Sequence, residues 1–127
     1  MKCVYCIDDD PFILHMLGYQ LRKHFNDRSI IVELIDKAAN AVSIIEKNTE
    51  QKIVPLIGIV DYQMPDVNGA EVIRKSKEKF PEMKFIMISG ESHRKEINGL
   101  FEDKLLEHYI DKPWDEDELI SSVEPYL

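Results

Sequence analysis

The sequence lacks long apolar runs, and this absence argues against a membrane protein. No apolar segment approaches the ~20 residues that a membrane-spanning helix needs. The N-terminal segment MKCVYCIDDD contains an apolar stretch that is too short for a signal peptide and is followed at once by three aspartates. From these two observations we expect a cytoplasmic protein that does not associate with membranes.

Internal repeats and stretches rich in Gly, Ser or Pro are also missing, which excludes solenoid and disordered architectures. Hydrophobic residues make up 44% of the 127 residues, and charged residues of both signs make up 31%. A chain of this length and apolar content can bury the core of one compact domain. We therefore expect a single domain that covers residues 1–127.

Positive charge is in deficit. The formal net charge of −8 repels the phosphates of nucleic acids and anionic lipids, and no segment gathers Lys and Arg on one face. We expect no direct binding to nucleic acid.

The two cysteines have the C-x-x-C spacing that redox pairs and zinc sites use. Cys3 and Cys6 lie, however, in the segment Lys2–Ile7, which has the composition of a strand. Side chains three positions apart on a strand point to opposite faces. We therefore expect two separate buried thiols rather than a disulfide or a metal site.

Apolar periodicity divides the chain into five strand and helix units. The expected strands are Lys2–Ile7, Ile30–Ile35, Leu56–Val60, Lys84–Ile88 and His108–Asp111. A helix is expected after each strand. The first carries apolar residues from Ile13 to Phe25, the second runs from Ala38 to about Asn48, and the third begins at Gly69. The fourth ends near Leu106, and the last begins with a capping box formed by Asp115 and Glu118. This alternation predicts an α/β fold with a parallel sheet covered by helices on both faces.

Polar residues follow four of these strands. The carboxyl ends of parallel strands meet at one edge of the sheet, where ligands bind. The residues at this edge are Asp8, Asp9, Asp10, Asp61, Ser89 and Lys112. Clustered carboxylates stay ionised in a half-buried crevice only if a cation compensates them, and Mg²⁺ takes oxygen ligands and accepts a phosphate. A hydroxyl from Ser89 and the charge of Lys112 would complete a phosphate site.

Four segments occur in the order IDDDP, VDYQMPDVNG, MISGES and YIDKPW. Together they resemble the receiver domain of two-component response regulators, including chemotaxis regulators, and the resemblance extends from Ile7 to Trp114. It implies a flavodoxin-like (βα)5 three-layer sandwich with a five-stranded parallel sheet in the order 2-1-3-4-5. It also implies phosphorelay signal transduction, in which a sensor histidine kinase or phosphotransfer protein phosphorylates the domain and a downstream effector domain or protein reads it.

The resemblance assigns roles to single residues. Asp61 matches the phosphoryl acceptor, which forms an aspartyl phosphate. Asp8 and Asp9 match the acidic pair that binds Mg²⁺ together with Asp61, and Gln63 stands where the family offers a backbone carbonyl to the metal. Gln63 and Glu91 also occupy positions at which the family tunes hydrolysis.

Three further roles follow from the same resemblance. Ser89 and Lys112 match the residues that contact the phosphoryl oxygens. Ser89 also pairs with Tyr109 as the switch, in which the hydroxyl moves toward the phosphoryl group and the aromatic ring turns inward. Pro113 follows the lysine through a peptide bond that is commonly cis in the family.

The sequence departs from the family pattern at two places. The interval between Asp9 and Asp61 is longer than usual, and we expect the excess in a loop around 48–54. The run Leu105-Leu106-Glu107-His108 stands where the family often has small Gly or Ala residues before the aromatic switch. We therefore expect an unusual output face, formed by the helix before Leu106, the strand His108–Asp111 and the last helix.

Two other functions compete with this interpretation. A haloacid-dehalogenase-type phosphatase would use Asp8 as nucleophile and Asp10 as acid. That interpretation leaves Asp61 unexplained, and Pro11 and Phe12 do not fit the continuation of its motif. A phosphorylation-independent adaptor would keep the fold and lose acidic residues, and none is missing. We expect Asp10 to face solvent, and we expect a phosphoacceptor rather than an enzyme, as a monomer or a phosphorylation-dependent dimer. The chain is either a stand-alone regulator or part of a longer one.

Overall fold

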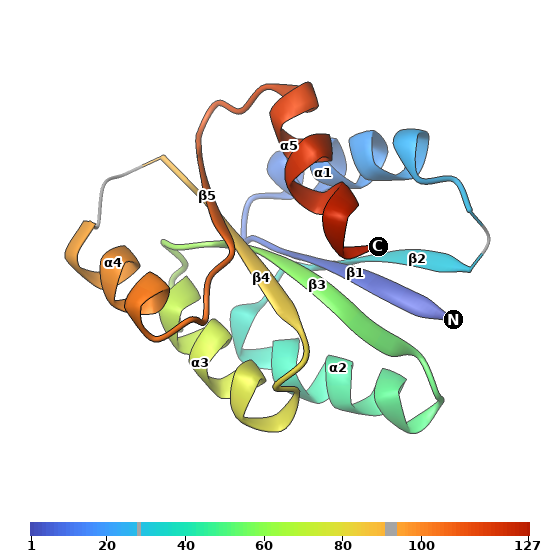
Figure 1. Ribbon diagram of the computed structural model, residues 1–127, viewed down its shortest axis with the longest axis horizontal. Helices are drawn as coiled ribbons and strands as arrows, with labels where there is room; N and C mark the ends of the chain where they lie inside the picture. Colours follow the sequence, from blue (N-terminus) through green and yellow to red (C-terminus); the bar gives the residue numbers. More distant parts are fainter. Residues whose placement is uncertain (28, 91–93) are drawn as a thin grey trace.

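The computed structural model describes residues 1–27, 29–90 and 94–127. Its parallel sheet has the strand order β2-β1-β3-β4-β5, as Figure 1 shows. The strands are β1 (Lys2–Ile7), β2 (Ile30–Ile35), β3 (Val54–Asp61), β4 (Lys84–Ser89) and β5 (His108–Asp111). The helices are α1 (Pro11–His24), α2 (Ala41–Glu50), α3 (Gly69–Lys79), α4 (Arg94–Glu102) and α5 (Glu116–Val123), with 3₁₀ turns at Ala38–Asn40 and Glu124–Tyr126. The expected α/β fold, strand order included, is confirmed.

Helices cover both faces of the sheet and make three layers. In Figure 1, α1 and α5 lie on one side of the strands, and α2 and α3 lie on the other. The first face is packed by Leu17, Leu21 and Leu119, and the second by Ile45, Ile73 and Leu100. Because successive residues of β4 enter the two apolar clusters in turn, its segment KFIMIS is apolar almost throughout.

The two cysteines lie as expected. Cys3 belongs to the apolar cluster beneath α2 and α3, whereas Cys6 belongs to the cluster beneath α1 and α5. Both are buried and free. The sheet itself therefore separates the two thiols.

The loop expected around 48–54 is wrong in part. Helix α2 continues to Glu50, and a short turn with Lys52 at φ 66° leads into β3, which begins at Val54. Strand β3 pairs with β1 through a shift of register in which Cys3 lies opposite Pro55 and Val4 lies opposite Ile57. A β-bulge takes up an extra residue in this way, so part of the added length lies within the strand.

The helix expected to run to about Leu106 ends earlier. Helix α4 stops at Glu102, and Lys104 takes a left-handed conformation with φ 60°. The backbone N–H of Leu105 then returns to the carbonyl of Leu100 at 2.9 Å. This closure leaves Leu106 buried, with 4% of its surface exposed, ahead of β5.

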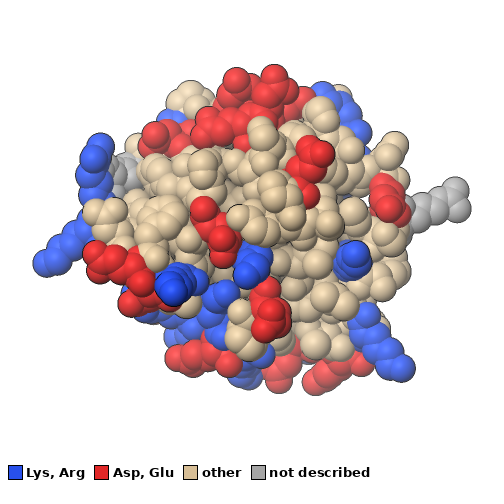
Figure 2. Space-filling view, viewed as in Figure 1, with Lys and Arg blue, Asp and Glu red and all other residues tan. Residues whose placement is uncertain are grey.

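Helix α5 begins as the sequence indicates, although the cap differs in detail. Asp115 accepts a hydrogen bond from the backbone N–H of Asp117 at 3.1 Å, one position short of the bond in a capping box. Figure 2 shows acidic side chains gathered over the start of α5, where Asp115, Glu116, Asp117 and Glu118 lie. Negative charge at a helix N-terminus is favourable.

Within the described residues, no helix is both long and apolar enough to cross a membrane.

Candidate phosphoryl and metal site

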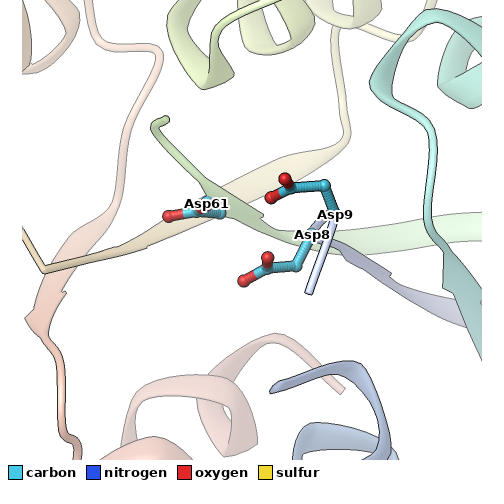
Figure 3. A group of neighbouring side chains, drawn as sticks. All are labelled: Asp8, Asp9 and Asp61. Atoms are coloured by element: carbon cyan, nitrogen blue, oxygen red, sulfur yellow. The ribbon is translucent and has the colours of Figure 1, made fainter. Parts of the chain in front are cut away.

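The carboxyl edge of the sheet gathers the side chains that the strand ends predict. A pocket of about 350 Å³ there is lined by Asp8, Asp9, Asp10, Asp61, Gln63, Ser89, Gly90 and Lys112. Asp8 follows β1, Asp61 ends β3, and Lys112 follows β5. Figure 3 shows the carboxylates of Asp8, Asp9 and Asp61 on neighbouring strand ends.

Lys112 lies between two buried carboxylates. Its Nζ is 3.1 Å from Oδ2 of Asp8 and 3.2 Å from Oδ1 of Asp61. The side chains of Asp8 and Asp61 are 2% and 7% exposed, so both charges are largely removed from water. One ammonium thus serves two carboxylates, and the site keeps an excess of negative charge.

The pKa values reflect this excess. Burial raises the pKa of Asp8 to about 6, and the charge of Asp61 adds to the rise, while the Asp10 backbone N–H and Lys112 oppose it. Burial also raises the pKa of Asp61, against the opposing charge of Lys112. Burial alone would lower the pKa of Lys112, but the two carboxylates outweigh it and raise that pKa. A cation at this edge would favour the ionised form of both acids.

Asp8, Asp9 and Asp61 fit a divalent cation. One carboxylate oxygen from each lies within 4.8 Å of the others. Asp9 is exposed, so that side of the group is open to solvent. Three oxygen donors with water access suit Mg²⁺, which keeps several waters and accepts substrate phosphates. Gln63 lines the same pocket, and its role through a backbone carbonyl stays a prediction.

Tyr109, within β5, reaches Ser89, the last residue of β4, through its hydroxyl group. Ser89 is 1% exposed, and its carbonyl accepts hydrogen bonds from the backbone N–H of Lys112 at 3.0 Å and from the Tyr109 hydroxyl at 3.4 Å. The lysine and the tyrosine therefore both contact the backbone of Ser89. Glu91 lies outside the described residues.

Gly69 has a structural role that the sequence analysis did not assign. A Cβ at this position would collide with the backbone carbonyl oxygen of Asp61, and the Gly69 N–H donates to the carbonyl of Tyr62 at 2.7 Å. Helix α3 thus begins directly against the end of β3, a close approach that only glycine permits. The motif VDYQMPDVNG carried this signal as a glycine at the start of a helix.

Asp10 is exposed, as expected, but it also caps α1. Its side chain accepts a hydrogen bond from the backbone N–H of Phe12 at 2.9 Å, with Pro11 in the first turn. An aspartate followed by proline is a known signal for a helix start. The third aspartate therefore belongs to the helix cap rather than to the carboxylate group.

The Lys112–Pro113 peptide bond is cis, as the resemblance implies.

Comparison with known proteins decides the family. A model of the response regulator receiver domain matches residues 4–124. The chain belongs to the response regulator receiver family. Membership excludes the dehalogenase-type phosphatase, because the fold and the ordered motifs are those of a receiver domain.

The receiver domain is similar to regions of longer regulators. It is 33% identical over 99 residues to the uncharacterized transcriptional regulatory protein YesN of Bacillus subtilis, covering 78% of this chain and 26% of that protein. It is 28% identical over 120 residues to the hydrogenase transcriptional regulatory protein HoxA of Bradyrhizobium diazoefficiens, covering 94% of this chain and 23% of that protein. The chain thus spans about a quarter of the length of these relatives.

Solved receiver domains share the fold. A CheY-like receiver domain protein from Methanospirillum hungatei superposes with a TM-score of 0.84 at 23% identity, covering 98% of this chain and 92% of that one. Response regulator TrrA from Thermotoga maritima, solved in complex with Mg²⁺ and beryllofluoride, gives 0.78 at 23% identity, and each chain is fully covered.

Proposed function

We propose that this receiver domain accepts a phosphoryl group from a histidine kinase or phosphotransfer protein onto Asp61, with Mg²⁺ bound beside it. One observation carries the proposal: Lys112 lies between Asp8 and Asp61 in a pocket that also holds Asp9. An excess of buried carboxylates over cations destabilises the folded protein. The same excess is suited to binding a metal ion and a phosphoryl group.

The metal ligands would be Asp8, Asp9 and Asp61, with the backbone carbonyl of Gln63. When bound, Mg²⁺ supplies positive charge beside the oxygens of the transferring phosphoryl group. Asp8 holds Lys112 at 3.1 Å and so keeps the ammonium within reach of the same oxygens. Asp9 is exposed and leaves that side of the pocket open to solvent.

The transfer needs a carboxylate nucleophile in line with the donor bond. An Asp61 oxygen attacks phosphorus, the O–P bond forms, the N–P bond of the donor phosphohistidine breaks, and the electron pair stays on the imidazole nitrogen. Lys112 moves from pairing with Asp61 to pairing with a phosphoryl oxygen, so its charge is used before and after transfer. The Ser89 hydroxyl donates to a second phosphoryl oxygen.

The conformational switch would begin with a movement of Ser89. Its carbonyl contacts both the Lys112 N–H and the Tyr109 hydroxyl, so a movement of Ser89 toward the phosphoryl group alters the support of the tyrosine. Tyr109 lines a groove of about 300 Å³ with Arg94, Ile97 and Phe101 of α4. A change in this groove is what a downstream partner would read.

The donor would cover the exposed face of α1. Phe12, Met16 and Tyr19 are 84%, 51% and 64% exposed, and their spacing places them on one side of the helix. Two of them line a groove of about 420 Å³ that also contains Lys112, so this apolar face continues into the phosphoryl site. A protein that presents phosphohistidine to Asp61 would bury it.

The remaining features are proposed on the same basis. The domain is a cytoplasmic phosphoprotein that catalyses its own phosphorylation and dephosphorylation at most, without turning over a substrate as an enzyme does. Its effector is a downstream domain or protein, as in relatives that are named transcriptional regulators. The domain itself makes no direct nucleic acid contact, and it is a monomer or dimerises on phosphorylation.

Intact-mass spectrometry after incubation with acetyl phosphate and Mg²⁺ tests the proposal. We expect one added phosphoryl group in the wild type and none in Asp61→Ala or in the presence of a chelator. Absence of any adduct would favour the phosphorylation-independent adaptor. Adduct formation that persists in Asp61→Ala would contradict the assignment of Asp61.

A further inference from the structure

A partly buried hydrogen bond connects the loop that follows Lys112 to α1. The indole Nε1 of Trp114 donates to Oε1 of Gln20 at 2.8 Å. Gln20 is 9% exposed and lies on the packed side of α1 with Leu17 and Leu21. Trp114 is half-buried and packs against the apolar cluster under α1 and α5. The bond therefore joins two segments far apart in the sequence.

The polar character of this contact needs a reason. The buried side of α1 is otherwise leucine and glycine, and an amide in such a place costs free energy unless it is hydrogen-bonded. Packing alone would be served by an apolar residue at position 20 and a phenylalanine at position 114. An amide and an indole instead fix the direction in which the ring points, because one N–H meets one oxygen.

Lys112 lies two residues before this contact. The backbone of the loop from Lys112 to Asp115 is also held at its two ends: the Lys112 N–H donates to the carbonyl of Ser89 at 3.0 Å, and Asp115 caps α5. The Lys112 side chain lines the same groove as Gln20 and Trp114. The Ser89 bond holds the loop to β4, and the Gln20–Trp114 bond holds it to α1.

We infer that Gln20 and Trp114 are positioning residues for Lys112: their hydrogen bond fixes the loop so that the ammonium reaches both Asp8 and Asp61. This inference rests on the proposed function. Neither side chain contacts the reacting atoms. Their effect passes through the placement of one charge, so their loss should slow phosphoryl transfer and should not weaken the binding of the metal.

Three variants separate this role from simple packing. Gln20→Met keeps the size and loses the oxygen, Trp114→Phe keeps an aromatic ring and loses the N–H, and Gln20→Glu keeps an acceptor for the indole. Gln51→Met is the matched control, because it makes the same change of Gln to Met at an exposed position in the turn after α2. Initial rates with acetyl phosphate and Mg²⁺ affinity by calorimetry are measured on the full chain, with circular dichroism to confirm folding.

For Gln20→Met and Trp114→Phe we expect rates about fivefold lower, the factor equivalent to one hydrogen bond of ~1 kcal/mol. Mg²⁺ affinity should rise by about twofold, because a displaced ammonium competes less for the two carboxylates. The double variant should lose no more than either single one. Gln20→Glu should recover most of the rate that Gln20→Met loses, and Gln51→Met should keep the wild-type rate.

Two results would overturn the inference while leaving the proposed function intact. The first is a wild-type rate in Gln20→Met. The second is a fall of rate and Mg²⁺ affinity together that Gln20→Glu does not rescue, which would mark a packing role. A wild-type chain that takes no phosphoryl group at all would instead contradict the proposed function.

Discussion

Two buried polar side chains, one within β1 and one directly after it, have different surroundings. Tyr5 is fully buried on the face covered by α2, where Nδ2 of Asn48 donates to its hydroxyl at 3.0 Å and also to a carboxylate oxygen of Glu33. Asp8 is 2% exposed at the carboxyl edge, where it shares the Lys112 ammonium with Asp61.

The difference separates structure from function. At Tyr5 a neutral hydroxyl has a neutral partner, and burial then adds to stability. At Asp8 two carboxylates compete for one ammonium, and the raised pKa values of both acids show that the folded state holds their charges at a cost. The first network contributes free energy to folding, whereas the second gives up free energy that binding of a cation or phosphoryl group can recover.

The largest effect is expected when the shared ammonium is removed. Lys112→Met should slow phosphorylation by acetyl phosphate about 100-fold, because a charge aimed at the transferring oxygens is lost. Mg²⁺ affinity should rise, because the carboxylates lose their internal counter-ion. Stopped reactions followed by mass spectrometry, with calorimetry for Mg²⁺, measure both, and Lys47→Met on the exposed side of α2 is the control. Equal loss of rate in the control would contradict the role.

Removal of one competing carboxylate should have opposite effects on stability and binding. Asp8→Asn should raise the free energy of unfolding at pH 7 without Mg²⁺ by ~1–2 kcal/mol, because one buried charge disappears. Mg²⁺ affinity should fall by at least about tenfold, since a carboxylate ligand is lost. Urea unfolding and calorimetry measure the two quantities. A variant that is less stable than the wild type would show that Asp8 is a structural ion pair.

A loss of stability is expected when the network of Tyr5, Asn48 and Glu33 is broken. Asn48→Leu removes the donor shared by Tyr5 and Glu33, and the free energy of unfolding should fall by ~1–2 kcal/mol. The rate of phosphorylation should stay within about twofold of the wild type, because none of Tyr5, Glu33 and Asn48 lines the pocket. Urea unfolding and acetyl phosphate kinetics test both parts. A large loss of rate would connect the two networks.

The smallest effect is a pH dependence. The pKa of Asp8 is about 6 in the folded protein against 3.8 for a free side chain, so the folded state binds more protons between these values. The contribution of Asp8 to the free energy of unfolding therefore rises as pH falls from 7 toward 4. The stability gap between Asp8→Asn and the wild type, ~1–2 kcal/mol at pH 7, should therefore narrow toward zero across this range. A stability gap that widens as the pH falls would mean that folding lowers the pKa of Asp8 and would contradict this prediction.

Much of the fold was predictable because strand periodicity and strand ends are local features. The segments KCVYCI, IIVELI and HYID form strands at the predicted bounds, and the order of the sheet followed from the family resemblance. Boundaries that depend on tertiary contacts were missed. The end of α4 depends on a left-handed Lys104, and the start of β3 on a bulge against β1.

The residues of the site were predictable for a similar reason, since each lies at the end of a strand. Their arrangement was not. Nothing local shows that the Lys112 ammonium is shared by Asp8 and Asp61, or that Gln20 faces Trp114, because these contacts span 104 and 94 positions of the chain. The cap formed by Asp10 and the close approach at Gly69 carried local signals that could have been read.

The carboxylate that carries the phosphoryl group can be identified chemically. Borohydride converts an aspartyl phosphate to homoserine, which peptide mass spectrometry locates. After treatment with acetyl phosphate and Mg²⁺, we expect homoserine at position 61 alone. Homoserine at position 8 or 9 would contradict it, because the acids now assigned to the metal would then be the nucleophiles.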